Sequence, residues 1–439
     1  MNNLYLRVFI IIFLIGISKS ESIAQLTGGW IIQQNPTTYD LNDVKFFDID
    51  IGLIVGDTGT ILKTTNSGNN WLLISSGTTK NLNSISLTST SVVYVAGDSG
   101  IILKSTDSGS SWTLLSSQTD NDLTTIVFKT PEIGFAAGKK GTILRTSNSG
   151  INWVETFSDT TVSFNSMCYV NNNFIWALGQ RYSEFSVGTP IPLKSTDIGL
   201  SWNETSIDIY EGTSIFFLDT LNGFALNCST LLNLGILRTT NGGLDWNCEW
   251  GGFNDPSKIF FVNQSTGYSV GRGFSNHAIN KTTDSGFSWY FSSTASIIYL
   301  ELNSVHFVNP EIGWTVGRFV LSPSNLISTN ILKTTNGGGF LTNVIKTTSA
   351  TPSEFRLVQN YPNPFNPSTR ISFHINVSSF IVLSVYNSEG RKIETLHESN
   401  LNAGSYEITF DGSNYPSGVY YYKLEADGNS LSKKMLLLK

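Results

Sequence analysis

The feature that most constrains the fold of this chain is a short turn motif that recurs along most of its length. In the copy at 105–112, Ser105 is followed by Asp107, Gly109 and Trp112. An Asp or Asn in such a turn accepts hydrogen bonds from nearby backbone N–H groups. The Gly supplies a positive φ, and the Trp buries a large ring against a sheet. The motif therefore predicts a β-hairpin turn that is anchored in a core.

Six copies of this motif are complete, and a seventh at 334–341 has Leu341 where the Trp is expected. The complete copies place these residues at the Asp/Asn, Gly and Trp positions: Asn66, Gly68, Trp71, Asp107, Gly109, Trp112, Asn148, Gly150, Trp153, Asp197, Gly199, Trp202, Asn241, Gly243, Trp246, Asp284, Gly286 and Trp289. Between successive motifs the sequence offers four short apolar strands in a constant order. Repeats of this length and content predict a seven-bladed β-propeller over 25–341.

Composition agrees with an all-β chain. Charged residues make up 14% and aromatic residues 12% of the 439 residues, and Thr, Ser, Val, Ile, Phe and Tyr are abundant, as is typical of strands. The net charge of −6 argues against a nucleic-acid partner, because the chain offers no basic footprint for phosphates. We expect a monomer.

Ring closure follows from the phase of the repeat. The repeat begins on a strand at Trp30 and ends on the motif that lacks its Trp. We therefore favour an N-terminal strand at 30–34 as the last strand of the seventh blade, which would leave no exposed sheet edge. The alternative is that residues 341–345 supply that strand themselves.

The N-terminus reads as a signal peptide over 1–24. An apolar run at 8–17 precedes a small-x-small cleavage site at Ser22-Ile23-Ala24, which is the pattern of a secretory signal. Ten apolar residues are too few to span a bilayer. The mature chain is therefore expected to leave the cytoplasm.

The last part of the chain changes character. Residues 342–354 are polar and read as a linker. Residues 355–439 contain short alternating strands separated by turn signals such as Asp411-Gly412 and Asp427-Gly428. This spacing predicts a small Ig-like β-sandwich.

Both parts resemble known families. The repeats over 28–341 resemble Asp-box (BNR) propellers, and among these the photosystem II stability and assembly factor propellers; the blades alone imply no photosystem partner. The segment 355–439 closely resembles the type A C-terminal sorting domain of the type IX secretion system, with landmarks at 360–369, 417–420 and 434–439. This resemblance implies the type IX machinery as a partner, and a location at the cell surface or outside the cell.

The loops opposite the turn motifs are the expected binding surface. They are longer in blades four to seven than in blades one to three, and long loops on a rigid scaffold commonly carry binding sites. The candidate ligand-binding residues in these loops are Arg181, Tyr182, Glu184, Arg272, His277, Arg318, Lys139 and Lys140. Three arginines around one mouth would suit a carboxylate, sulfate or acidic glycan. The alternative is that these are solvated charges beside tight turns.

We interpret the propeller as a non-catalytic scaffold for an unknown protein or anionic glycan ligand. The alternative is a sialidase-like or other glycan-degrading glycoside hydrolase, which the three arginines, Tyr182 and Glu184 would serve. Against it, the Arg-Ile-Pro motif expected near the first strand in sialidases is missing. No cofactor is expected, and the isolated histidines argue against a metal site.

The three cysteines do not suggest a disulfide framework. Cys168, Cys228 and Cys248 are irregularly spaced, so we interpret them as small buried apolar residues. A bridge between Cys228 and Cys248 would have to join two strands that are not neighbours, which the repeat disfavours.

Deletion of residues 355–439 is predicted to trap the protein in the periplasm, because the signal peptide would still direct it across the inner membrane. Cell fractionation followed by immunoblotting measures the distribution. Truncated protein outside the cell would refute the assignment of a sorting role to this segment.

Overall fold

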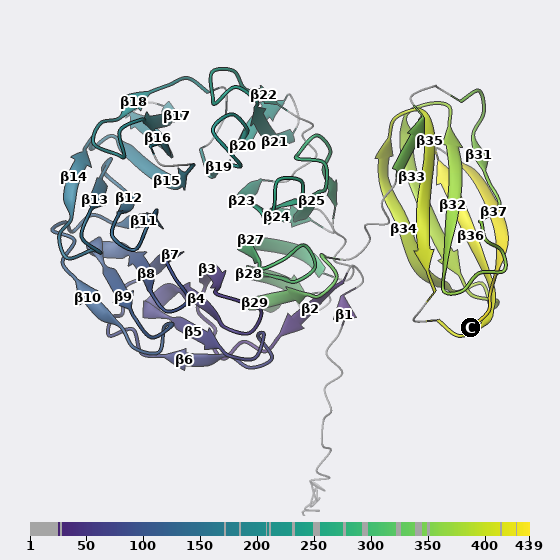
Figure 1. Cartoon of the computed structure of the whole chain (residues 1–439), viewed down its shortest axis with the longest axis horizontal. Helices are drawn as coiled ribbons and strands as arrows, with labels where there is room; N and C mark the ends of the chain where they lie inside the picture. Colours follow the sequence, from purple (N-terminus) through teal and green to yellow (C-terminus); the bar gives the residue numbers. More distant parts are fainter. Residues whose placement is uncertain are drawn as a thin grey trace, which may run out of the picture.

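The computed structural model describes residues 25–26 and 29–439, apart from the short stretches 171–172, 184–185, 208, 210–211, 231–232, 249–254, 275–277, 292–296, 322–325, 339–344, 349–351, 413–414 and 427. The predicted signal peptide lies outside these residues. The described chain consists of strands and turns, with two single 3-10 turns, η1 (Asp57–Gly59) and η2 (Asp98–Gly100). Figure 1 shows a ring of small sheets and a separate sandwich. The predicted all-β class is confirmed.

The ring is built from four-stranded antiparallel units that follow one another along the chain. The first three units are β3 (Leu41–Phe46), β4 (Gly52–Gly56), β5 (Ile61–Thr64) and β6 (Leu72–Ile74); β7 (Leu82–Leu87), β8 (Val93–Gly97), β9 (Ile102–Ser105) and β10 (Thr113–Leu115); and β11 (Leu123–Phe128), β12 (Gly134–Gly138), β13 (Ile143–Thr146) and β14 (Val154–Phe157).

The next three units are β15 (Val162–Tyr169), β16 (Ile175–Ser183), β17 (Ser186–Ser195) and β18 (Asn203–Glu204); β19 (Ile215–Phe217), β20 (Gly223–Thr230), β21 (Asn233–Thr239) and β22 (Asn247–Cys248); and β23 (Pro256–Phe261), β24 (Gly267–Phe274), β25 (Ile279–Thr282) and β26 (Tyr290–Phe291). The last unit contains β27 (Ile297–Phe307), β28 (Gly313–Leu321), β29 (Leu326–Thr334) and β2 (Trp30–Gln33). We refer to these units as blades one to seven.

The N-terminal strand closes the ring, as predicted. β2 pairs antiparallel with β29, and Trp30 lies opposite Thr334, the first residue of the seventh motif. The Trp30 side chain is fully buried and meets Phe307 edge-on at 6.0 Å between ring centroids. Trp30 therefore occupies the place of the Trp that the seventh motif lacks. The short strand β1 (Gln25–Leu26) continues the same sheet.

The turn motif has the predicted geometry with one addition. The Asp107 carboxylate accepts hydrogen bonds from the backbone N–H groups of Ser110 and Ser111, both at 2.9 Å, and the Gly109 N–H donates to Ser105 Oγ at 2.8 Å. Gly109 has a φ of 82°, and the preceding Ser108 also has a positive φ of 57°. Two successive left-handed residues thus form the turn.

The glycine and tryptophan of the motif contact the neighbouring blade as well as their own. A Cβ on Gly243 of blade five would lie 2.7 Å from the ring of Trp176 in blade four. Trp176 stacks on Phe217 of blade five at 5.1 Å, and Trp246 meets Phe217 edge-on at 5.9 Å. Comparable aromatic triplets join other neighbouring blades: Trp314, Phe46 and Trp71; Tyr94, Phe128 and Trp153; Phe224, Phe261 and Trp289; Tyr268, Phe307 and Trp30.

A basic residue just before several of the motifs adds a second contact between blades. Lys104 Nζ donates to the Ser149 carbonyl of the next motif at 3.1 Å, and Lys194 Nζ donates to the Gly242 carbonyl at 3.0 Å. Arg145 Nε makes the same contact to Ile198 at 2.9 Å. These carbonyls belong to left-handed residues of the motif turns. The turn of one blade therefore supplies the hydrogen-bond acceptor for a basic side chain of the preceding blade.

The first strands of the blades are also joined by side chains that accept backbone hydrogen bonds. The Phe46 N–H donates to His306 Nδ1 at 3.3 Å, and the Phe217 N–H donates to Cys168 Sγ at 3.3 Å. Burial holds the pKa of His306 well below its ordinary value and raises the pKa of the Cys168 thiol to about 11. Both groups are therefore neutral acceptors with a structural role, as the sequence suggested for Cys168.

The prediction that Cys228 and Cys248 are not bridged is wrong. They form a disulfide between β20 and β22, with their Cα atoms 6.0 Å apart. Cys228 lies opposite Gly235 on the intervening strand β21, and Cys248 lies opposite Leu237. Because residues two apart on a strand share a face, the bridge passes over β21 beside a residue that has no side chain.

The C-terminal sandwich consists of two four-stranded sheets. One is β30 (Ile345–Thr348), β35 (Gly404–Asp411), β32 (Ser368–Ile375) and β31 (Arg356–Leu357); the other is β34 (Lys392–Leu401), β33 (Ser379–Tyr386), β36 (Gly418–Ala426) and β37 (Asn429–Leu437). The predicted linker 342–354 is partly wrong, because Ile345–Thr348 pairs with β35.

The alternative closing strand of the propeller at 341–345 lies mostly outside the described residues.

Acid is predicted to destabilise the ring through the motif carboxylates. Hydrogen bonds, first of all from Ser201, lower the pKa of Asp197 to about 2, and those from Ser111 and Ser105 lower that of Asp107. A carboxylate whose folded pKa is depressed stabilises the fold above its unfolded pKa of about 3.9 and loses that contribution as the pH falls. The Asp107→Asn, Asp197→Asn double variant should therefore lose less stability between about pH 5 and about pH 2.5.

Urea denaturation at several pH values measures this effect. Asp245→Asn is the control, because it makes the same substitution within the fifth motif at a carboxylate that only accepts a hydrogen bond from the turn residue, Asn241, at 2.9 Å and does not itself form the turn. An unchanged pH dependence in the double variant would contradict the stabilising role of the charged motif carboxylates.

Candidate functional site

The face opposite the turn motifs carries the residues that the sequence singled out. Loops between the second and third strands, and between one blade and the next, lie on this face because consecutive antiparallel strands alternate in direction. Arg181 lies on β16, Arg272 on β24 and Arg318 on β28. Glu184 and His277 lie outside the described residues.

Two of the three arginines are brought together by a carboxylate that the sequence analysis did not identify. Arg272 of β24 and Arg318 of β28 both lie opposite Glu301 of β27. Arg272 Nε is 2.6 Å from Glu301 Oε1, and Arg318 Nη1 is 3.9 Å from Glu301 Oε2. Arg318 also makes a two-point ion pair with Asp40, in which Nε donates to Oδ1 at 2.7 Å. The extension of β24 along β27, where blades six and seven meet, creates this network.

Arg181 belongs to a different network in blade four. Its Nη1 and Nη2 atoms donate to Glu204 at 3.2 and 3.1 Å, and Nη2 lies 3.5 Å from Asp159. The hydrogen bonds to Glu204 raise the pKa of Arg181, as those to Asp40 raise that of Arg318. Each of the three arginines is thus already paired with carboxylates of the protein, and Arg272 and Arg318 share one of them. Binding of an anionic ligand by these residues stays a prediction, and such a ligand would have to compete with those partners.

The remaining candidate ligand-binding residues, among those described, contact other side chains or lie in an exposed turn. Lys139 Nζ is 2.7 Å from Asp122, and Lys140 occupies a turn with a φ of 54°. The Tyr182 ring is half exposed, and its hydroxyl donates to Gln180 Oε1 at 2.6 Å. The structure therefore places Tyr182 in a local side-chain contact within β16.

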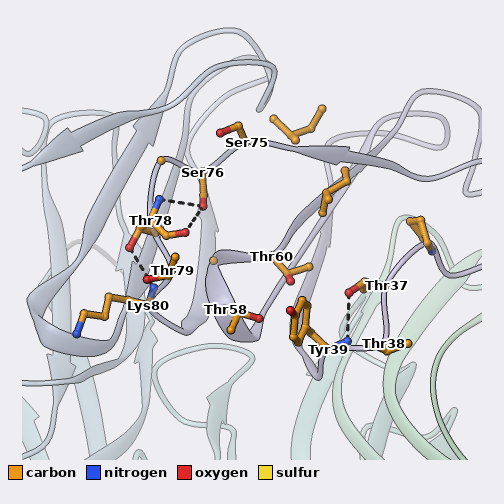
Figure 2. A pocket seen from close by; sticks show the side chains of 15 residues that line it. Thr37, Thr38, Tyr39, Thr58, Thr60, Ser75, Ser76, Thr78, Thr79 and Lys80 are labelled. Carbon is orange, nitrogen blue, oxygen red and sulfur yellow. Dashed lines mark hydrogen bonds between the residues drawn. The ribbon is translucent and has the colours of Figure 1, made fainter.

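An open groove of about 1080 Å³ lies on the same face, at blade one (Figure 2). Its walls are the loop from β2 to β3 and the loop from β6 to β7, and the turn between β4 and β5 lies between them. The lining residues are Pro36, Thr37, Thr38, Tyr39, Thr58, Gly59, Thr60, Leu73, Ile74, Ser75, Ser76, Gly77, Thr78, Thr79 and Lys80. The groove could not be recognised from the sequence, because short Ser/Thr-rich stretches are typical of ordinary turns.

The groove is rich in hydroxyl groups and carries one positive charge. Its lining contains no Asp, Glu or His, and its one charged residue is Lys80. Internal hydrogen bonds fix several hydroxyls: the Thr78 N–H donates to Ser76 Oγ at 3.3 Å, and the Lys80 N–H donates to Thr78 Oγ1 at 3.1 Å. Tyr39, which is 52% exposed, is the one aromatic residue of the lining.

The groove and the arginine network adjoin each other. Tyr39 precedes Asp40, the carboxylate that Arg318 holds. The candidate surface therefore extends from Arg272 through Glu301, Arg318 and Asp40 to the groove, across the seam where the ring closes. Among the described residues, no group of three His, Cys, Asp or Glu side chains could hold a metal ion, and no helix is long and apolar enough to cross a membrane.

Two known families match segments of the chain. Residues 359–438 match the family described as the secretion system C-terminal sorting domain. The chain therefore carries a type IX secretion sorting domain. Residues 23–120 match the family described as photosynthesis system II assembly factor YCF48.

Solved structures agree on the propeller fold. A structure titled "YCF48 bound to D1 peptide" is 16% identical, with a TM-score of 0.52 over 70% of this chain and 97% of that one. YCF48 from Cyanidioschyzon merolae is 18% identical, with the same TM-score over 70% and 98%. The WD40 repeats of RRP9 are 8% identical, with a TM-score of 0.53 over 71% and 99%. At these identities the likeness shows the fold alone. No curated protein matches the chain.

Proposed function

We propose that this exported propeller is a non-catalytic binding module that takes its ligand on the face opposite the turn motifs. The sorting domain indicates export by type IX secretion to the cell surface or the extracellular space. The observation that carries the proposal is the groove at blade one, which is large enough for a ligand and whose lining has no carboxylate or imidazole. Such a surface offers hydrogen bonds and shape, and no pair of carboxyl groups for acid and base catalysis.

The charged groups elsewhere on this face support the same proposal. A glycoside hydrolase needs two carboxyl groups on either side of the scissile bond, or in sialidases a Tyr nucleophile beside an arginine triad. Here Arg181 pairs with Glu204 in blade four, whereas Arg272 and Arg318 share Glu301. The Tyr182 hydroxyl is bonded to Gln180. No observation specifically favours the glycan-degrading alternative.

Two kinds of partner follow from this proposal. The C-terminal domain would engage the type IX secretion machinery, and the propeller over 25–341 would bind a protein or glycan outside the cell. One of the structures with the same fold is YCF48 bound to a D1 peptide. A propeller of this fold can therefore present a surface for a ligand, which supports a binding role.

The exported protein is predicted to bind a ligand without transforming it. Incubation with a chromogenic sialoside and with neutral polysaccharides should release no chromophore or new reducing ends above the blank, because the groove lining has no carboxyl group or imidazole. A glycan array and a pull-down with surface proteins measure binding. Hydrolysis that is abolished by Tyr182→Phe would overturn the proposal, and Gln180→Ala serves as the control for the local contact.

A further inference from the structure

We propose that the groove at blade one binds an uncharged oligosaccharide, with Tyr39 as the ring against which a sugar packs. This inference rests on the proposed binding function and names the ligand class for one site on that face. The groove holds about 1080 Å³ and is lined mainly by Thr, Ser, Gly and Tyr. A sugar ring presents both hydroxyls and an apolar C–H face, so a lining of hydroxyls with one exposed aromatic ring is complementary to it.

Tyr39 is held in place although its side chain is exposed. Its N–H donates to Thr37 Oγ1 at 3.1 Å, and the Thr37 N–H donates to Asn35 Oδ1 at 3.1 Å. The next residue, Asp40, is fixed by the ion pair with Arg318. A half-exposed ring on an anchored backbone loses little conformational entropy when a ligand packs on it.

The repeat itself shows what is special about this groove. The loop around Ser76 and Thr78 recurs in blade two, where the Thr119 N–H donates to Ser117 Oγ at 3.4 Å and the Asn121 N–H donates to Thr119 Oγ1 at 3.2 Å. The Asp57 N–H donates to the Asp40 carbonyl, and in the next blade the Asp98 N–H donates to the Asn81 carbonyl. Asp40 and Asn81 are therefore equivalent positions, and so are the residues that precede them, Tyr39 and Lys80. Of these related loops, the one before blade one supplies the aromatic ring.

The hydroxyl groups of the lining favour an uncharged ligand over an acidic one. Lys80 is the sole charged residue in the groove, and the nearby Asp122 carboxylate offsets its charge. The hydroxyls of Thr58, Thr60 and Thr79 can each donate and accept a hydrogen bond. They therefore match sugar hydroxyls, which also do both, better than they match a carboxylate or sulfate, which only accepts.

The test uses the full exported chain and titration calorimetry with defined probes. The neutral probes are cellohexaose, laminarihexaose, maltohexaose and chitohexaose; the comparators are hexagalacturonate and an uncharged peptide of Gly, Ser and Thr. We expect at least one neutral probe to bind, with an affinity that changes little when salt is raised, since no charges pair. Tyr39→Ala should weaken that binding about tenfold or more, and Tyr39→Phe should keep most of it.

Tyr421→Ala is the matched control, because Tyr421 is also an exposed tyrosine but lies on β36 of the sandwich, outside the groove. Binding that survives Tyr39→Ala and is lost in Tyr182→Ala or Arg318→Ala would overturn this inference and leave the proposed function standing. Binding of the peptide or of hexagalacturonate alone, or of no probe at all, would also overturn it. Hydrolysis of any probe would overturn the proposed function as well.

Discussion

The contact between a motif glycine and an aromatic ring of the preceding blade is the interaction on which the ring depends. At Gly243 the backbone approaches Trp176 so closely that a Cβ would collide with the ring. The motif tryptophan and a phenylalanine of the first strand complete an aromatic cluster between the two blades. Because comparable clusters recur at other blade junctions, these turns fix the angle between neighbouring sheets as well as the hairpins that contain them.

This arrangement divides the two faces between structure and binding. On the motif face, turn carbonyls accept hydrogen bonds from lysines or arginines of the neighbouring blade, as Lys104 and Arg145 show. Charges and hydroxyls on the opposite face are free to vary without loosening these contacts. The Arg272–Glu301–Arg318 network and the groove beside Tyr39 both lie there, which is why we place the function on that face.

The sequence was informative where a residue's role depends on its own repeat. The motif predicted the turns, and the missing Trp at Leu341 predicted that Trp30 would close the ring, as the pairing with Thr334 confirms. The sequence was uninformative where the role of a residue depends on its contact with a residue of another strand. The Cys228–Cys248 bridge exists because Gly235 leaves space above β21, and the arginines are neutralised by cross-strand carboxylates that no local pattern reveals. The groove arises where two Thr-rich loops face each other across a turn.

A double-mutant cycle on Trp176 and Trp246 tests the central claim most directly. The two rings lie on neighbouring blades, 6.4 Å apart and edge-on. Urea unfolding of Trp176→Leu, Trp246→Leu and the double variant, followed by far-ultraviolet circular dichroism, gives their coupling energy. Our account predicts a favourable coupling of about 0.5–1.5 kcal/mol, the range for aromatic pairs. Effects that add to within about 0.3 kcal/mol would show that the motif stabilises only its own blade.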